Sequence, residues 1–497
     1  MVHLHRMHAD KAEGDDGMAM NVKPRDEAAI FSHLKALTAN DAPWRTGKTF
    51  AYVYDPGRDV EAIAKRAYME FLTENALDPT AFPSLLRLEN ELVAYAATHL
   101  NAPEGAAGNF TSGGTESCML AVKTARDFAR AVKPEVKEPE IILPVTAHAA
   151  FHKAAHYMGL KKVLVPVDPV TFKADPKLIE AAITPNTIQI VASAVSYAHG
   201  VLDPIPEIGE IAQRRGTLFH VDGCIGGFLL PYFERLGEKL APFDFRVPGV
   251  TSMSMDFHKY AYCPKGASVI LHRSKDIRRF QIFTCAEYTG YTLINPTILS
   301  TKSGGPLAAA WAVINYLGDE GYMRFARRIH EATKKIIAGI KATSGLKLLA
   351  EPDTNLVAFT SDEFPVFHVI DEMKKDGWLL QAQLGYMGSR DNVHLSIGQS
   401  NLEQVDDFLR DLKSAVARAR LIPRSNVIEG LKAEVAKLGP DDMTPATLLR
   451  LATMAGIGGK LPERMADLNL ALDALPPKLS EMALTEFFNN MYVPRRG

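Results

Sequence analysis

Cysteine is scarce in this sequence. The chain has 497 residues and only four cysteines, and no two of them form a Cys-x-x-Cys pair. Such scattered cysteines argue against a disulfide framework of the kind that stabilises small secreted domains. We therefore expect reduced thiols, in the core or lining a site of a cytoplasmic protein, at Cys118, Cys224, Cys263 and Cys285.

An excess of charge of one sign is also lacking. The 56 Lys and Arg residues are offset by 58 Asp and Glu residues, so the net charge is −2. A chain without a basic excess has little to hold a polyphosphate backbone, which argues against nucleic acid as a partner.

Long hydrophobic runs are absent as well. No segment approaches the roughly 20 apolar residues that a membrane helix requires. The longest candidate, Pro306 to Leu317, is typical of a buried helix, and residues 1–20 lack the apolar core of a signal peptide. We predict no transmembrane segment and a cytoplasmic location.

The order of the expected elements indicates three parts. Residues 1–90 form a polar arm and a helical segment, 91–305 a large domain, and 306–497 a smaller α+β domain with a helical tail. In the large domain, short apolar runs at 140–145, 162–167, 188–195, 218–223, 252–255 and 267–272 alternate with helical spacing. This alternation predicts a mostly parallel, open sheet with helices on both faces, which binds ligands at the carboxyl ends of its strands.

A glycine-rich turn, residues 109–117, leads directly into a helix, although it is neither a G-x-G-x-x-G motif nor a P-loop. Backbone amides at a helix start, with glycines that allow close approach, form a site for a phosphate group. The alternative is a structural Gly-Gly turn in which Thr115 caps the helix.

Two charged residues follow expected strands further along the chain. Asp222 ends a strand of otherwise apolar character, so it either pairs with a cation, such as a protonated pyridine nitrogen, or caps a turn. Lys259 lies just beyond a strand, where its amine can reach a carbonyl cofactor over the sheet. To act as a nucleophile, this amine needs a pKa below its free value of about 10.4. The other His-Lys dipeptide, at Lys153, lies inside an expected helix.

Three histidines, His148, His152 and His156, recur every four residues on one expected helix face, so a metal-dependent enzyme is a different possible class. No His-Glu-x-x-His motif accompanies them, and no carboxylate is spaced to complete a ligand set. We expect no metal, and packing roles with one histidine facing a ligand.

Taken in chain order, the motifs resemble those of the group II decarboxylases that depend on pyridoxal phosphate (PLP), and they are most similar to the sphingosine-1-phosphate lyase branch. The similarity covers residues 45 to about 415, with an echo at FFNNMY in the tail. It is carried by VYDPGRDVEAIAKRAYMEF, NALDPTAFPSLLRLENELV, NFTSGGTESCMLAVKTARD, TAHAAFHKAAHYMG, AHGVLDPIPEI, LFHVDGCIGGFLLPYFERLG and FDFRVPGVTSMSMDFHKYAYCPKGAS. The resemblance implies an α/β, aspartate aminotransferase-like fold (type I), with a mostly parallel seven-stranded sheet in the large domain and a smaller α+β C-terminal domain.

Roles at the site follow from the resemblance position by position. It implies that Lys259 forms a Schiff base with PLP, that Asp222 keeps the pyridine nitrogen charged, and that His148 stacks over the ring. The implied residues are Lys259, Asp222, His148 and Tyr197 for catalysis; Gly114, Thr115, His148, Asp222, His258, Lys259 and Gly304 for the cofactor; and Tyr54, Asn75, Lys265 and Tyr492 for the substrate.

The resemblance also implies a homodimer with composite active sites, in which residues 1–90 make dimer contacts. The segment from Tyr54 to Asn75 and the loop near Gly304 would come from the neighbouring subunit.

The implied substrate is a small phosphorylated amine. The implied reaction is retro-aldol cleavage of a phosphorylated sphingoid base (sphingosine-1-phosphate or dihydrosphingosine-1-phosphate) to a fatty aldehyde and phosphoethanolamine. An amino-acid decarboxylase of the same fold is the alternative, since Lys265 can orient a carboxylate as well as a phosphate. Four positions depart from the lyase pattern, and one of them is Gly223, which replaces an alanine. Asp78 replaces a histidine, Tyr288 lies in a segment that replaces Trp-x-Gly-Gly, and Lys302 replaces an arginine.

Overall fold

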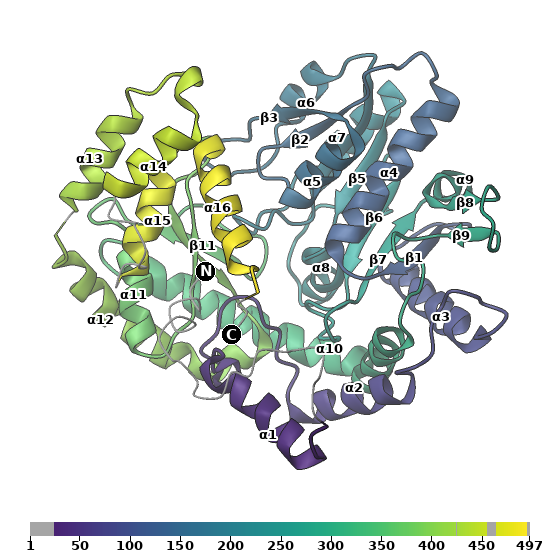
Figure 1. Cartoon of the computed structure of the whole chain (residues 1–497), viewed down its shortest axis with the longest axis horizontal. Helices are drawn as coiled ribbons and strands as arrows, with labels where there is room; N and C mark the ends of the chain where they lie inside the picture. Colours follow the sequence, from purple (N-terminus) through teal and green to yellow (C-terminus); the bar gives the residue numbers. More distant parts are fainter. Residues whose placement is uncertain (1–23, 424, 455–463, 495–497) are drawn as a thin grey trace.

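The expected strands in the middle of the chain form one sheet in the computed structural model, which describes residues 24–423, 425–454 and 464–494 (Figure 1). The sheet has seven strands in the order β1-β7-β6-β5-β4-β2-β3. They are β1 (Ala107–Thr111), β2 (Glu140–Pro144), β3 (Lys161–Val165), β4 (Thr187–Ser193), β5 (Leu218–Asp222), β6 (Ser252–Asp256) and β7 (Ser268–His272).

The sheet is mostly parallel, as the resemblance implies, and this prediction is confirmed. Only β7 runs antiparallel to its neighbours, β1 and β6. The other pairs are parallel, and Asp222 in β5 lies opposite Ser254 in β6. The sequence pattern does not predict β1, because its residues AGNFT include few of the β-branched and aromatic side chains that favour strands.

Helices cover both faces of the sheet. α4 (Gly114–Val132) and α5 (Ala149–Met158) share a core cluster with Ile141 and Leu143 of β2. α6 (Pro176–Ala182), α7 (Ile205–Arg215) and α8 (Gly226–Arg235) share the opposite cluster with Ile142. Because successive strand residues point to opposite faces, a continuous apolar strand packs against both helix layers.

The smaller domain is built on a second sheet, which is antiparallel and has the strand order β10-β11-β13-β12. Its elements are β10 (Lys347–Leu348), β11 (Leu356–Thr360), α11 (Phe367–Lys375), β12 (Gln381–Gln383), β13 (Asn392–Ser396) and α12 (Val405–Arg420). The tail helices are α13 (Asn426–Val435), α14 (Pro445–Met454), α15 (Met465–Ala474) and α16 (Pro477–Met491), and they pack beside this sheet (Figure 1).

One long helix, α10 (Gly304–Lys341), joins the two domains. It is kinked at Gly318, whose φ is 57°. Leu307 and Ile329 belong to the core of the large domain, whereas Ile336 and Ile340 belong to that of the smaller domain. Between β7 and α10 lie α9 (Lys275–Arg278) and the hairpin β8 (Phe283–Cys285) and β9 (Leu293–Asn295).

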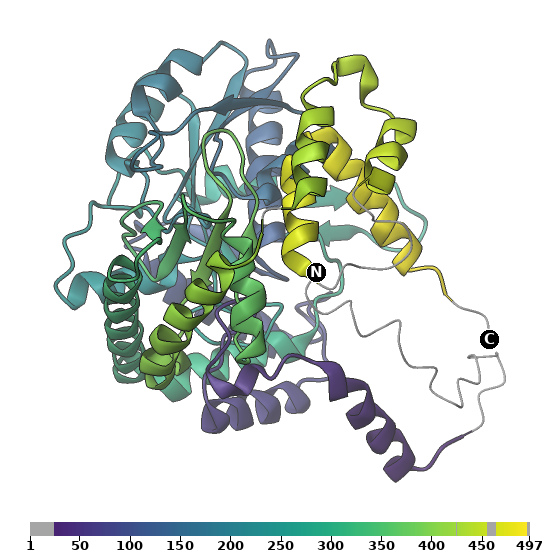
Figure 2. The same ribbon diagram turned by 90° about the vertical axis from the view of Figure 1, so that its left-hand side faces the viewer.

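The N-terminal helices differ in how far they pack against the rest of the chain. α2 (Arg58–Glu70) packs on α10, and α3 (Pro83–His99) contacts β1 and β7. The domain boundary expected at residue 90 therefore falls inside α3, and this helix as a whole belongs with the large sheet. By contrast, α1 (Glu27–Leu37) has no buried residue and projects from the body (Figure 2).

None of the described helices is long and apolar enough to cross a membrane.

Candidate active site

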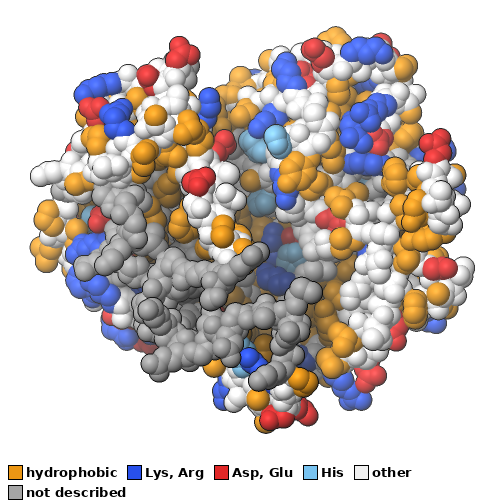
Figure 3. Space-filling view, viewed as in Figure 1, with side chains coloured by type: hydrophobic (Ala, Val, Ile, Leu, Met, Phe, Trp, Pro, Cys, Tyr) orange, Lys and Arg blue, Asp and Glu red, His pale blue; other side chains and the backbone are white. Residues whose placement is uncertain are grey.

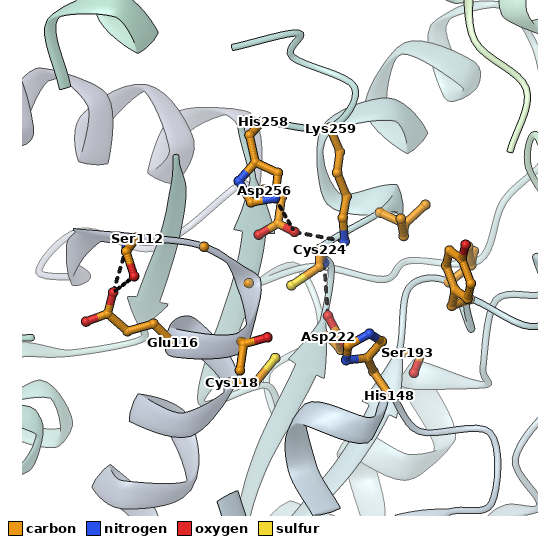
Figure 4. Close-up of a pocket in the computed structure, with 16 residues that line it drawn as sticks. Ser112, Glu116, Cys118, His148, Ser193, Asp222, Cys224, Asp256, His258 and Lys259 are labelled. Carbon is orange, nitrogen blue, oxygen red and sulfur yellow. Dashed lines mark hydrogen bonds and ion pairs between the residues drawn. The ribbon is translucent and has the colours of Figure 1, made fainter. Parts of the chain in front are cut away.

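A cavity of about 350 Å³ lies at the carboxyl ends of β4, β5 and β6, beside the start of α4 (Figure 4). On the surface, His and Lys or Arg side chains are visible in the hollow between the two domains (Figure 3). The cavity is lined by Ser112, Gly113, Gly114, Thr115, Glu116, Cys118, His148, Ser193, Val195, Tyr197, Asp222, Cys224, Ile225, Asp256, His258 and Lys259. The four residues predicted to be catalytic are all among them.

Lys259 follows β6 and extends its side chain toward the centre of the cavity (Figure 4). Its Nζ lies 2.8 Å from Oδ2 of Asp256. Burial lowers the pKa of Lys259, but the Asp256 carboxylate outweighs this effect, and the pKa lies well above its usual value. The depressed pKa that nucleophilic attack requires is not found here, because the Asp256 carboxylate is paired with the amine.

Asp256 carries the complementary charge of this pair. Burial raises the pKa of Asp256, yet the charges of Lys259 and His258 lower it overall, so the group is a carboxylate. Its Oδ1 is buried without a hydrogen-bond partner in the described part of the chain.

Asp222 ends β5 and lines the cavity from its own strand, one position along the sheet from β6. Oδ1 accepts from the Cys224 amide at 3.0 Å and from the Ser254 hydroxyl at 3.3 Å. Behind this carboxylate, the buried His220 side chain lies 3.4 Å from the Ser254 hydroxyl through Nε2. These contacts hold Asp222 in place but supply no cation, which leaves the carboxylate available to a cationic ligand.

The start of α4 has the features expected of a phosphate site. The helix is capped by Gly113, whose φ is 150°, and it has no side-chain cap, so the alternative with Thr115 as the cap is wrong. A Cβ atom at Gly114 would lie 2.7 Å from Oδ2 of Asp256, which requires glycine there. The first amides of a helix have no acceptor within it, so those of α4 are free to bind an anion.

Two hydrogen bonds shape the loop before α4. Glu116 Oε2 accepts from the Ser112 amide at 2.6 Å and from its hydroxyl at 2.7 Å. The loop is thus held by a residue of the helix that it precedes.

The histidines around the cavity are held by backbone amides. His258 Nδ1 accepts from the Ala267 amide at 3.3 Å, and burial lowers the pKa of His258 to about 4, so its ring is neutral near pH 7. His148 caps α5, and its Nδ1 accepts from the Ala150 amide at 3.2 Å.

Tyr197 lines the cavity from the loop after β4. Its hydroxyl donates to Oε1 of Gln381 at 2.6 Å, which ties the large domain to β12. Burial raises the pKa of Tyr197, so its hydroxyl keeps its proton near pH 7.

Among the described residues, His148, His152 and His156 do not join a group of side chains spaced to hold a metal ion. Only His148 of the three histidines lines the cavity, and His152 Nδ1 lies 3.5 Å from the Lys162 amine.

Tyr54 and Lys265 form a second group close to Lys259. Lys265 Nζ lies 4.7 Å from the centroid of the Tyr54 ring, which packs edge-on against Tyr260 with centroids 5.0 Å apart. Desolvation, followed by the charge of Lys259, lowers the pKa of Lys265 to about 8. Burial raises the pKa of Tyr54, whereas the Lys259 charge opposes this shift.

The expectation that Tyr54 reaches the site from a neighbouring subunit is therefore wrong in this structure. Phe50 anchors the preceding segment in the core of the smaller domain, and its amide donates to the Leu379 carbonyl at 3.0 Å. This anchor brings Tyr54 beside Tyr260 and Lys259 of its own chain.

Asn75 and Gly304 meet elsewhere, and neither lines the cavity of its own chain. Asn75 pairs with Ser303 in an isolated bridge, and the Gly304 amide donates to the Glu74 carbonyl at 2.8 Å. Nearby, Asp78 is exposed and accepts from the Thr80 amide at 2.8 Å. The hydrogen bonds from Thr80 lower the pKa of Asp78, so it is ionised near pH 7.

Three further residues named in the sequence analysis lie outside the cavity. Tyr492 follows α16 and is 77% exposed, and Tyr288 in the β8–β9 connection is also exposed. Lys302 is buried, with its Nζ 2.5 Å from Oε2 of Glu89. Lys302, which replaces an arginine of the lyase pattern, thus forms a structural ion pair beneath the start of α10.

Sequence reasoning gave no role to Asp256 and Ser193 among the lining residues, and it left open whether Cys118 and Cys224 lie in the core or line a site. The spacing Asp-x-His-Lys, which belongs to the resemblance, could have identified Asp256. Nothing in the sequence joins Cys118 to Cys224, because they come from different elements.

Groups suited to an aldehyde, a protonated ring nitrogen and a phosphate thus face a single cavity. PLP carries all three, and this fold with this site defines a PLP-dependent enzyme.

The profile of the pyridoxal-dependent decarboxylase conserved domain matches residues 15–362, and a profile for a C-terminal domain of pyridoxal-dependent enzymes matches residues 429–490. The chain belongs to the pyridoxal-dependent decarboxylase family.

The proteins similar to this chain include both lyases and decarboxylases. A sphingosine-1-phosphate lyase of Arabidopsis thaliana is 39% identical over 443 residues, or 88% of this chain and 76% of the relative. The structure of a sphingosine-1-phosphate lyase of Burkholderia pseudomallei aligns at 34% identity with a TM-score of 0.77, over 84% of this chain and 96% of that one. An L-aspartate/L-glutamate decarboxylase of Pyrococcus horikoshii is 32% identical over 388 residues, or 78% of this chain and 97% of the relative.

Proposed function

We propose that this enzyme cleaves the Cα–Cβ bond of a phosphorylated sphingoid base, giving a fatty aldehyde and phosphoethanolamine. The observation that carries the proposal is the second cationic group near Lys259. Lys265, with Tyr54 beside it, lies close enough to Lys259 to be affected by its charge. One amine can hold the cofactor while the other binds a substrate anion. The similarity to sphingosine-1-phosphate lyases supports phosphate as that anion.

Five kinds of contact would hold the cofactor. Lys259 would bind its aldehyde carbon, Asp222 its ring nitrogen, and the amides of Gly114 and Thr115 its phosphate. His258 would add a contact to the phosphate, and His148 would cover the ring. When bound, PLP supplies an electron sink for the bond that breaks.

The chain's own residues would then direct the reaction. Burial raises the pKa of both Tyr54 and Tyr197, so their hydroxyls stay protonated. Tyr54 would donate its proton to the substrate, whereas Tyr197, which donates to Gln381, would accept from it. Lys259 is the amine positioned to move a proton at the substrate Cα or at its 3-hydroxyl oxygen. Asp256, which is ion-paired with Lys259, would keep that amine inside the cavity.

Decarboxylation of an amino acid is the second candidate function, and the decarboxylase relative favours it. Lys265 would then orient a second carboxylate of the substrate. Mass spectrometry of products from phosphorylated sphingoid bases and from free amino acids separates the two. Fatty aldehyde with phosphoethanolamine is the result we expect. Release of carbon dioxide from an amino acid, with the sphingoid phosphates left intact, would replace the lyase proposal by the decarboxylase one.

We also propose a homodimer with composite sites. Asn75 and Gly304 lie together outside the cavity of their own chain, which is the arrangement needed if they complete the site of a partner. The unburied α1 offers Ile30, Phe31 and Leu34, which are 44%, 62% and 51% exposed. A second subunit covering α1 would bury apolar surface that a lone chain leaves in water.

A mixing experiment tests the composite site. Inactive Asn75→Ala and Lys259→Ala homodimers, mixed and allowed to exchange subunits, should regain part of the activity, because one hybrid site has both residues. Tyr54→Ala mixed with Lys259→Ala should regain no activity, because Tyr54 lies beside Lys259 of its own chain and every hybrid site lacks one of the two side chains. An active monomer in sedimentation would contradict the proposal.

For location, we propose the cytoplasm. All four cysteines are free in the structure, and three of them are buried, as suits a reducing compartment.

A further inference from the structure

Two cysteines and an aspartate form a compact group on one side of the cavity. Cys118 comes from α4, and Cys224 lies two residues after Asp222 at the end of β5. The two sulfur atoms and a carboxylate oxygen all lie within 4.8 Å of one another, and all three residues are buried. Figure 4 shows the three side chains on the same side of the cavity.

No other group of three or more His, Cys, Asp or Glu side chains in the described ranges has this spacing. The three histidines of α5, the candidates that the sequence offered, do not form one. The ligand atoms of the cysteine group come from two elements on adjacent parts of the large domain. The group therefore forms only when the chain folds, and no local sequence motif predicts it.

The donor set selects the kind of ion. Two thiolates and one carboxylate are ligands for Zn²⁺ and its thiophilic analogue Cd²⁺, whereas Mg²⁺ and Ca²⁺ prefer oxygen alone. Three protein ligands leave a fourth position toward the cavity for water.

The carboxylates of Asp222 and Asp256 lie near enough to both cysteines to interact with them, so negative charge surrounds the group. Each thiol would release its proton to solvent as the ion binds. The Lys259 charge lies near enough to interact with Cys224, so it would offset part of the negative charge left at the site.

We propose that, in the cofactor-free enzyme, Cys118, Cys224 and Asp222 bind one thiophilic divalent cation, and that this cation and the cofactor exclude each other. The exclusion follows because all three ligands line the cofactor cavity and because the carboxylate of Asp222 cannot serve both partners. This exclusion rests on the proposed role of Asp222 toward PLP, whereas cation binding itself does not.

The test compares the full-length chain with and without PLP, using Cd²⁺ as the probe. The cofactor is removed with hydroxylamine and restored by incubation with PLP. Equilibrium dialysis gives the stoichiometry, and the ultraviolet thiolate-to-Cd²⁺ charge-transfer band reports sulfur ligation. We expect one Cd²⁺ per cofactor-free chain, with the band present, and at least about tenfold weaker binding in Cys118→Ser and Cys224→Ser. The PLP-loaded chain should show no band.

Two matched variants serve as controls. Cys285→Ser removes the most accessible thiol, and Cys263→Ser removes a buried thiol outside the cavity, so both should bind Cd²⁺ as the wild type does. Circular dichroism checks the fold, and Cys118→Ala replaces Cys118→Ser if the serine variant does not fold.

Three results would overturn the proposal. They are a wild-type cofactor-free chain without the band, a band that survives in both cavity variants, and a Cd²⁺ affinity that PLP loading leaves unchanged. An affinity unchanged by PLP would refute mutual exclusion of the cation and the cofactor. The proposed reaction is tested by the product assay instead, so its failure can be told apart from failure of the exclusion.

Discussion

The residues on the floor of the cavity all come together within one chain, whereas some of the residues assigned to the substrate lie outside the cavity of their own chain. At the floor, Lys259, Asp256 and Asp222 are held by strand ends, and Lys259 and Asp256 form an ion pair within the chain. Around it, Lys265 meets Tyr54 of the N-terminal segment, whereas Asn75 and Gly304 lie outside the cavity altogether. The residues assigned to the cofactor are thus positioned by strand ends of one sheet. The residues assigned to the substrate come from several segments, which must be brought together by packing.

The strongest test of the floor is Lys259→Ala. We expect turnover to fall by roughly 10⁴-fold or more, because the group that holds the cofactor is lost. Borohydride treatment of the wild type should attach PLP to Lys259, as read by peptide mapping. The matched control is Lys153→Ala, on the surface of α5, which should stay active. An adduct on Lys153 would contradict the assignment.

The ion pair at the floor is tested by Asp256→Asn. Because Asp256 raises the pKa of Lys259, its removal should lower that pKa in the cofactor-free chain. The neutral amine, which attacks the aldehyde, would then be present at lower pH. The rate of PLP capture, followed by absorbance against pH, should reach its midpoint at correspondingly lower pH. An unchanged midpoint in a folded variant would show that Asp256 does not control the amine.

Beyond the floor, Lys265→Ala should raise KM for a phosphorylated substrate by about 10- to 100-fold, with a smaller change in kcat, because a charge-assisted contact is lost. Lys177→Ala, at an exposed lysine of α6, is the control.

The pH dependence sharpens the same prediction. Since the pKa of Lys265 is about 8, its positive charge is present below that pH and lost above it. The value of kcat/KM should therefore fall above about pH 8, and Lys265→Arg should remove this fall because arginine stays charged. A fall that persists unchanged in Lys265→Arg would assign it to another group.

The smallest effect is expected at Asp78, which is ionised and exposed. If a partner subunit places it near the substrate phosphate, Asp78→His should lower KM a few-fold with little change in kcat, because a repulsive charge is removed. Glu104→Gln, at an exposed acid in the turn before β1, should leave KM unchanged. Equal effects of both variants would indicate a general change of surface charge.

Sequence reasoning succeeded where order along the chain carries the information. The apolar runs predicted the parallel strands, and Asp222 and Lys259 could be placed at strand ends because both follow such runs directly. It failed at β1, whose composition is weak for a strand, and at the boundary near residue 90, which lies inside α3. Both depend on contacts with distant segments that local patterns do not encode.

By itself, the sequence determined the fold class, the strand-end positions of Asp222 and Lys259, and the glycine turn that opens α4, because each depends on residue periodicity or local backbone preference. Only the tertiary structure decided that Asp256 raises the pKa of Lys259, that Tyr54 lies beside Lys265 of its own chain, and that Cys118 meets Cys224 next to Asp222. The physical reason is that charge and coordination depend on distances of a few ångströms, and packing alone sets those distances between segments far apart in the chain.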